Sequence, residues 1–188
     1  MTKQYIFGYG SLVDRGDLAL YLGEEKPQYE FVKFKGLKRD WSVAMDNRAD
    51  VPNYKYYVNA AQERVDKYIA FLNVSFDPNA EINGVIFPVD EAKLPELDAR
   101  ERNYRRVEIS HLSQSVHQGR VWTYMAKESS RQRFMEGLAQ DKVVIQKAYI
   151  DFVLAAFRAV GYHFLFDFIK STDFHHLPVL DLKRRTSE

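Results

Sequence analysis

One stretch decides the fold: Tyr5-Ile6-Phe7-Gly8-Tyr9-Gly10-Ser11-Leu12. Its first residues favour a buried strand, and two glycines then interrupt the apolar run. Ser11 and Asp14 have the Ser-x-x-Asp spacing in which a side-chain oxygen caps a first helical turn, and residues 17–22 have a helical pattern that ends at Gly23. The order of strand, glycine turn and helix directs backbone N–H groups outward, with the positive end of the helix dipole behind them. The sequence therefore predicts that this turn forms one side of a binding site for a carboxylate or phosphate.

This turn differs from the better-known glycine motifs. The dinucleotide fingerprint needs a third glycine where this chain has Val13, and the Gly-Lys-Ser/Thr ending of the P-loop is absent. Ser11 also lacks the Gly-x-Ser-x-Gly setting of a serine nucleophile. A nucleotide cofactor and a serine hydrolase are therefore disfavoured. A tight turn with Ser11 as a helix cap explains the same residues without any ligand.

Composition is that of a folded protein. With 188 residues, 46% of them hydrophobic and 28% charged, the chain fits a single domain, expected over residues 1–170, followed by a C-terminal tail over 171–188. The 27 basic and 26 acidic residues leave a net charge of +1, which gives no general attraction to nucleic acid or to an acidic membrane surface. We therefore expect a small molecule as the partner, while the oligomeric state stays open.

The absence of cysteine excludes disulfides, thiolate zinc sites and cysteine nucleophiles. No apolar run approaches the roughly 20 residues of a membrane span, and the first residues lead straight into a strand, not into a signal-peptide core. We expect a cytoplasmic protein.

Strand patterns dominate the first two-thirds of the chain. Residues 30–35 and 37–45, separated by Gly36, are expected to form two antiparallel neighbours. The turn-forming pairs around Pro78 and Gly84 are expected to join two further strands. The full set of expected strands after the first is 30–35, 37–45, 68–76, 85–89, 106–112 and 120–126, the last two flanking His117-Gln118-Gly119.

Helical patterns dominate the last third. A short helix over 91–101, capped by Asp90, comes earlier, and a further helix is expected over 162–170. A longer helix is expected before residue 162 and ends at Gly161. Its apolar face consists of Ile145, Tyr149, Phe152, Ala156 and Val160. The charged residues 183–188 are expected to fray. The pattern predicts an α+β domain around a largely antiparallel sheet or small barrel.

Glu101 is the candidate for proton transfer. It lies where the short helix ends, between apolar Leu97 and Tyr104, and desolvation in an apolar cleft makes a carboxylate a better base near neutral pH. An ordinary surface pair with Arg105 explains the same residue without catalysis. The sequence also contains five histidines, but none of them has metal-ligand spacing: His111, His117, His163, His175 and His176.

Two motifs in order resemble the γ-glutamylcyclotransferase-like superfamily. They are the opening Phe7-Gly8-Tyr9-Gly10-Ser11-Leu12 and the later Leu97-Asp98-x-x-Glu101-x-x-Tyr104-x-Arg106. The strand 121–124 and the helix that carries Tyr149 and ends at Gly161 are similar to later parts of that family. The resemblance implies a mostly antiparallel, barrel-like mixed sheet flanked by helices.

The resemblance also implies an activity that needs no cofactor. The free α-amine of a γ-glutamyl group attacks its own γ-carbonyl, which forms 5-oxoproline and releases an amine or amino acid. By this analogy Glu101 transfers the proton, and the substrate-binding residues are Tyr9, Gly10, Ser11, Leu12, Tyr149 and, more weakly, Tyr124.

Other functions remain open at this stage. They are a non-catalytic module that binds a small metabolite, and a γ-glutamyl amide hydrolase or acyltransferase. The leaving group is open as well, and we expect its pocket to involve residues 46–66, with Tyr54, Tyr56 and Tyr57.

Overall fold

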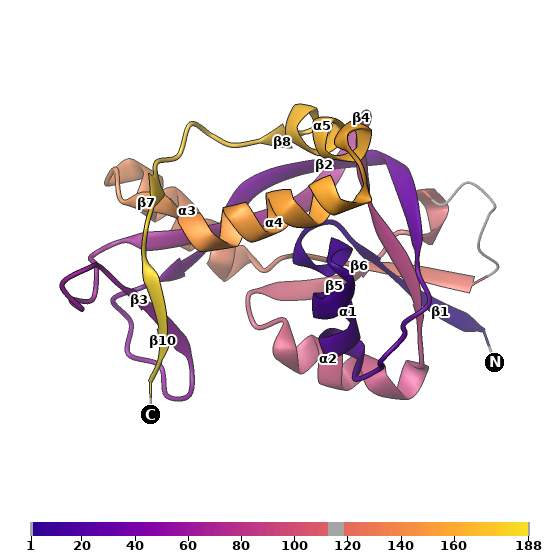
Figure 1. Ribbon diagram of the computed structural model, residues 1–188, viewed down its shortest axis with the longest axis horizontal. Coiled ribbons are helices and arrows are strands. Elements are labelled where there is room, and N and C mark those ends of the chain that lie inside the picture. The colour runs from indigo at the N-terminus through magenta and orange to yellow at the C-terminus, as the bar shows by residue number, and fades with distance from the viewer. Residues whose placement is uncertain (1, 113–118, 188) are drawn as a thin grey trace.

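The computed structural model describes residues 2–112 and 119–187, so His117 lies outside the described residues (Figure 1). Short 3₁₀ helices occupy Ser11–Val13, Glu91–Lys93 and Ser110–Leu112. The described strands are β1 (Lys3–Gly8), β2 (Glu30–Asp46), β3 (Lys55–Val58), β4 (Tyr68–Val89), β5 (Tyr104–Glu108), β6 (Gly119–Ala126), β7 (Val143–Gln146), β8 (Thr172–Asp173), β9 (Val179–Leu180) and β10 (Lys183–Thr186). The described helices are α1 (Arg15–Leu22), α2 (Leu94–Arg100), α3 (Glu128–Ala139), α4 (Lys147–Val160) and α5 (Tyr162–Lys170).

The large sheet is mixed and open. Its main order is β5-β6-β1-β4-β2-β8, with β7 on β4 and β9 on β7, while β10 and β3 form a separate two-stranded sheet. The long pairings of β4 with β1 and β2 are antiparallel, and the pairings of β8, β7 and β9 are short and parallel. The predicted α+β class with a mostly antiparallel sheet is confirmed, although the sheet does not close into a barrel.

Strands β2 and β4 are each longer than expected. Instead of four short strands, the two run antiparallel from the pair Glu30 and Ile86 to the pair Asp46 and Tyr68. The expected turn at Pro78 is an irregularity within β4, where residues 77–80 lie opposite Gly36 between paired positions. The prediction that 30–35 and 37–45 are antiparallel neighbours is therefore wrong, because cross-strand pairing on both sides of the irregularity overrides the local turn preference.

Helix α1 begins one turn later than the Ser11 cap predicted. Ser11 opens a 3₁₀ turn without a side-chain cap, and it is Asp14 whose carboxylate accepts the N–H of Asp17 at 2.9 Å. Gly23 ends the helix with a φ of 67°, as expected of a left-handed glycine cap. The chain between β1 and α1 is thus a turn in its own right.

Helix α4 crosses in front of the large sheet (Figure 1). It ends before Gly161 as predicted, but Ile145 belongs to β7, and the buried face consists of Ile150, Val153, Ala156 and Phe157. Phe152 is 38% exposed, so the predicted apolar face is wrong by part of a turn. Helix α5 has the expected bounds.

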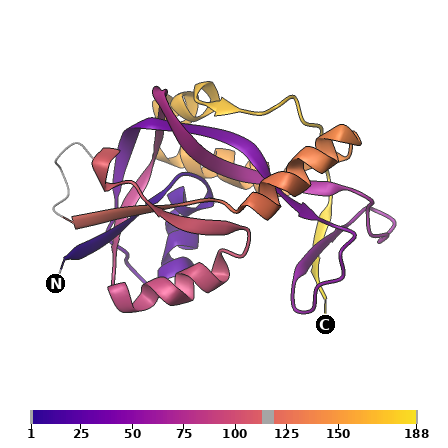
Figure 2. The same cartoon turned by 180° about the vertical axis from the view of Figure 1, so that it is seen from behind.

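The C-terminal residues are paired, not frayed. Strand β10 runs antiparallel to β3, with Arg184 opposite Tyr57 and Thr186 opposite Lys55. The two strands stand at the end of the molecule away from the N-terminus (Figures 1 and 2). The prediction of a frayed tail is wrong because pairing with a distant strand supplies order that the local sequence does not encode.

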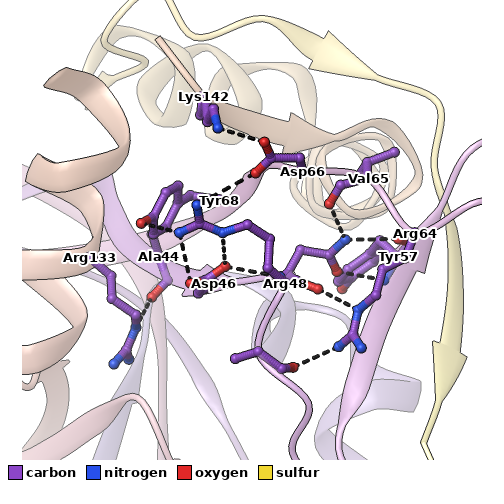
Figure 3. A network of polar contacts seen from close by, with 12 residues as sticks. Ala44, Asp46, Arg48, Tyr57, Arg64, Val65, Asp66, Tyr68, Arg133 and Lys142 are labelled. Carbon is purple, nitrogen blue, oxygen red and sulfur yellow. Dashed lines mark hydrogen bonds and ion pairs between the residues drawn. The ribbon is translucent and has the colours of Figure 1, made fainter. Parts of the chain in front are cut away.

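A polar network fixes the segment that carries β3 (Figure 3). The fully buried Asn47 donates to the carbonyls of Tyr57 and Val65, both at 2.9 Å, and accepts the N–H of Tyr57 at 2.7 Å. At the base of the segment, Lys142 donates to Asp66 at 2.6 Å. These bonds orient β3 relative to the large sheet.

Candidate functional site

A cavity of about 500 Å³ opens beside the turn that follows β1. It is a size typical of small-molecule sites. The residues that the sequence singled out come from β1 and its turn, the end of α2, β6 and α4. All seven of them line this one cavity: Tyr9, Gly10, Ser11, Leu12, Glu101, Tyr124 and Tyr149.

The turn that lines the cavity contains two backbone N–H groups without an acceptor inside the turn. Its first hydrogen bond joins the N–H of Val13 to the carbonyl of Gly10 at 3.1 Å, and the next joins Asp14 to Ser11 at 2.9 Å. The N–H groups of Ser11 and Leu12 precede these bonds and so have no acceptor within the turn. They are suited to bind an anionic group of a ligand.

Arg39 holds the other side of the turn, and sequence reasoning missed it. The residue is 1% exposed, and its guanidinium donates to the carbonyl of Tyr9 at 3.0 Å and to that of Asn83 at 2.8 Å. It also donates to the hydroxyl of Thr172 at 2.8 Å. A buried cation on β2 thus ties the turn to β4 and to the start of β8, which is a contact between segments that no local pattern reveals.

Gly10 and Tyr149 lie close together in the cavity. A Cβ added at Gly10 would be 3.7 Å from the hydroxyl of Tyr149 and 3.2 Å from Cδ1 of Leu72. The Tyr149 ring packs edge-on against Trp41 and Phe71, at centroid distances of 5.8 and 5.5 Å. These rings fix the direction of the Tyr149 side chain, and burial followed by the charge of Glu101 raises the pKa of its hydroxyl. It is a hydrogen-bond donor at neutral pH.

Glu101 stands at the C-terminal end of α2. Its N–H donates to the carbonyl of Leu97 at 3.1 Å, and its own carbonyl accepts the N–H of Tyr104 at 2.9 Å. Burial raises the pKa of the Glu101 carboxyl to about 7, although the charges of Lys55 and Arg100 oppose the rise. Near pH 7 such a group both accepts and returns a proton, which suits general acid–base catalysis.

Three further tyrosines at the cavity already donate their hydroxyls within the protein. Tyr9 donates its hydroxyl to the carbonyl of Tyr124 at 2.7 Å, and Tyr104 donates to the carbonyl of Leu72 at 2.7 Å. Tyr124 donates to Asp98 at 2.9 Å. Tyr124 therefore contributes a wall of the cavity, and a direct bond from its hydroxyl to a ligand stays a prediction.

Several lining residues were not among the sequence candidates. They include Tyr104, which the motif contained without a role, and Lys55 of the segment 46–66. Tyr57, which the sequence analysis named with Tyr54 and Tyr56 for the leaving-group pocket, also lines the cavity. Arg184 comes from β10 and had no signal in the sequence. Within residues 2–112 and 119–187, no group of three or more histidine, aspartate or glutamate side chains has a geometry that holds a metal ion. None of the helices in these ranges has the length and apolarity needed to cross a membrane.

Comparison with protein families gives one match. The model described as "Gamma-glutamyl cyclotransferase, AIG2-like" matches residues 6–141, which include the turn, Glu101 and Tyr124. Tyr149 and Arg184 lie beyond the matched residues. No curated protein matches the sequence significantly.

Several solved structures resemble this chain at low sequence identity. YkqA from Bacillus subtilis is 14% identical with a TM-score of 0.56, and the match covers 96% of this chain and 57% of that one. A structure described as a gamma-glutamyl cyclotransferase is 12% identical with a TM-score of 0.45, covering 73% and 79% of the two chains. A yeast gamma-glutamyl cyclotransferase described as specific to glutathione is 12% identical with a TM-score of 0.42, covering 67% and 69%.

Proposed function

The chain belongs to the AIG2-like gamma-glutamyl cyclotransferase family, and on that basis we propose that it converts a γ-glutamyl compound to 5-oxoproline. The α-amine nitrogen of the glutamyl group forms a bond to the γ-carbonyl carbon, and the bond from that carbon to the leaving nitrogen breaks. The proton lost by the attacking amine goes to the leaving nitrogen. Because the attack is intramolecular, the protein has to hold the chain curled and move one proton.

One observation carries the proposal: the glycine turn and Glu101, far apart in the sequence, line the same cavity. The N–H groups of Ser11 and Leu12, which have no acceptor within the turn, suit the glutamyl carboxylate and the developing oxyanion. The hydroxyl of Tyr149, which lies next to Gly10, supplies a further donor.

Glu101 acts in this scheme as the proton carrier. Its carboxylate takes the proton from the attacking amine and passes it to the leaving nitrogen, and a pKa of about 7 suits both transfers near neutral pH. No other carboxylate within the described ranges lines the cavity except Asp17 on α1.

Substitution of Glu101 by Gln tests the proposal. A panel of γ-glutamyl amino acids and γ-glutamylamines is incubated with each protein, and 5-oxoproline is measured by chromatography. We expect Glu101→Gln to lower the rate at least about 100-fold, the usual contribution of general acid–base catalysis. Glu96→Gln is the matched control, because Glu96 is an exposed residue of the same helix and does not line the cavity.

The products and the fold of the variant decide between the alternatives. Glutamate in place of 5-oxoproline identifies a hydrolase, and binding without any product identifies a non-catalytic module. Equal turnover by wild type and Glu101→Gln contradicts the proton-carrier role. A circular dichroism melt of the variant separates loss of chemistry from loss of folding.

A further inference from the structure

A second, smaller cavity of about 280 Å³ adjoins the main one at Glu101. Five residues line both cavities: Lys55, Glu101, Asn103, Tyr104 and Arg184. The glycine turn lines only the larger cavity. A substrate whose glutamyl head lies on the turn and whose leaving nitrogen lies at Glu101 therefore extends its leaving group toward Lys55 and Arg184.

The smaller cavity is strongly cationic. Four basic side chains line it, those of Lys55, Arg100, Arg102 and Arg184, and Glu101 is its single carboxylate. In the described part of the chain, none of the four has a carboxylate oxygen within 4.0 Å. Unpaired cations at a cavity wall favour an anionic ligand.

Two of these cations are both available for a ligand and placed at the main cavity. Arg100 is engaged, because it donates to the carbonyl of Tyr21 at 2.8 Å. The side chains of Lys55, Arg102 and Arg184 donate no hydrogen bond to any residue that the structure describes, and of these three only Lys55 and Arg184 also line the main cavity. Lys55 lies over the ring of Phe71, 4.0 Å from its centroid, which fixes its direction without neutralising its charge.

The strand register puts these two charges on one side of the small sheet. Arg184 pairs with Tyr57, and directly opposite residues share a face, as do residues two apart such as Lys55 and Tyr57. Lys183 and Arg185 therefore point to the other face, where Arg185 donates to Gln62 at 2.7 Å. Burial and the charge of Arg184 lower the pKa of Lys55 to about 8, which agrees with this proximity and leaves Lys55 mostly charged at pH 7.

We propose that Lys55 and Arg184 form a subsite for a carboxylate on the leaving group, so that the preferred substrate is a γ-glutamyl amino acid or peptide and not a neutral γ-glutamylamine. The inference rests on the proposed function, because it assumes that the glutamyl head occupies the turn. The C-terminal strand then determines the substrate class, although it lies outside the residues that the family model matches.

A matched pair of substrates tests this subsite. γ-Glutamylalanine and γ-glutamylalaninamide differ only in whether the leaving group ends in a carboxylate or a neutral amide. We expect kcat/KM for the acid to exceed that for the amide by about 10-fold, which is the effect of one charge-assisted contact at a partly exposed site. The enzyme should lose this preference at high salt, because salt screens the charges.

The substitution Arg184→Gln should lower kcat/KM for the acid by about 5-fold and leave the amide within about 2-fold. Lys55→Met should also lower the ratio of kcat/KM for the acid to that for the amide, while it shifts the pH dependence of both substrates through Glu101. Arg185→Gln and Lys183→Gln are matched controls from the opposite face of β10, and we expect neither to change the preference.

Binding measurements separate the subsite from the chemistry. Calorimetry on the Glu101→Gln protein gives the affinities for acid and amide without turnover. The subsite is supported if the acid binds more tightly than the amide and if Arg184→Gln abolishes this difference. Absence of 5-oxoproline formation by wild type overturns the proposed function alone and leaves this binding result standing. Equal affinities for the two compounds, or an Arg184→Gln effect of equal size on both, overturn the subsite.

Discussion

Glu101 combines a partly buried carboxyl with two nearby cations, and the balance between burial and charge sets the pH at which the carboxylate can accept a proton. Burial raises its pKa to about 7, Lys55 and Arg100 oppose the rise, and Asp17 adds to it. Because the proposed attacking step needs the ionised form, we expect activity above this pKa and its loss as the pH falls through it.

The pH dependence of turnover follows from this balance. We expect kcat/KM for a γ-glutamyl substrate to rise with pH up to about 7 and then to level off. In Lys55→Met the midpoint should move to higher pH, because a charge that favours the carboxylate is gone. Initial rates from pH 5 to 9 with both proteins measure the midpoints, and a midpoint in Lys55→Met at or below that of wild type contradicts the assignment.

Some residues of the candidate site could be predicted from the sequence, and others could not. The turn and Glu101 were predictable because each belongs to a short motif whose chemistry depends on neighbouring residues. Arg39 was not, since its role comes from bonds to Tyr9, Asn83 and Thr172, which are remote from it in the chain.

At the scale of elements, Asn47 holds the segment between β2 and β4. Its side chain is fully buried and makes three hydrogen bonds to the backbone of Tyr57 and Val65. Removing a buried side chain of this kind leaves backbone groups without partners, which costs free energy.

We expect Asn47→Ala to lower the free energy of unfolding by about 2 to 4 kcal/mol, as measured by urea denaturation. Asn59→Ala is the control in the same segment. The bonds of Asn59 to Glu63 are exposed, so its loss should be about 1 kcal/mol or less. A similar loss in both variants would mean that Asn47 does not anchor the segment.

The elements that sequence patterns missed have identifiable physical reasons. Helix α3 buries only Ser130, Phe134 and Gly137 and has no side-chain cap at Lys127, so it shows neither an apolar stripe nor a start signal. The turn signals near Pro78 failed because β2 pairs with β4 on both sides of them.

At the scale of the whole molecule, the long β2–β4 pair positions both a wall of the main cavity and the arginine that binds the glycine turn. Near one end of β4, Leu72 lines the main cavity, and further along Asn83 accepts from Arg39, which holds the turn. The β1 turn is placed by pairing of β1 with β4 and β6. The class of this sheet was predictable from its apolar strands, whereas the pairing of the charged β10 with β3 was not, because it is purely non-local.

We expect that last pairing to couple ligand binding to local folding. It joins distant parts of the chain, as in the bond from the N–H of Tyr54 to the hydroxyl of Ser187, 133 positions away, and every residue of β10 is exposed. Forming such a contact costs the entropy of closing a long loop and buries little surface in return. Detachment of β10 should therefore require less free energy than opening of the large sheet.

We expect the amides of β3 and β10 to exchange with deuterium at least about 100-fold faster than those in the centre of β4. A ligand with a carboxylate at Arg184 should slow that exchange, because it binds only the paired form. Equal protection of the two sheets would show instead that the strand is a fixed wall. If exchange follows the expected pattern, the affinity for the leaving group depends on the fraction of molecules in which β10 is paired with β3. The shape of a rigid pocket alone would then not determine that affinity.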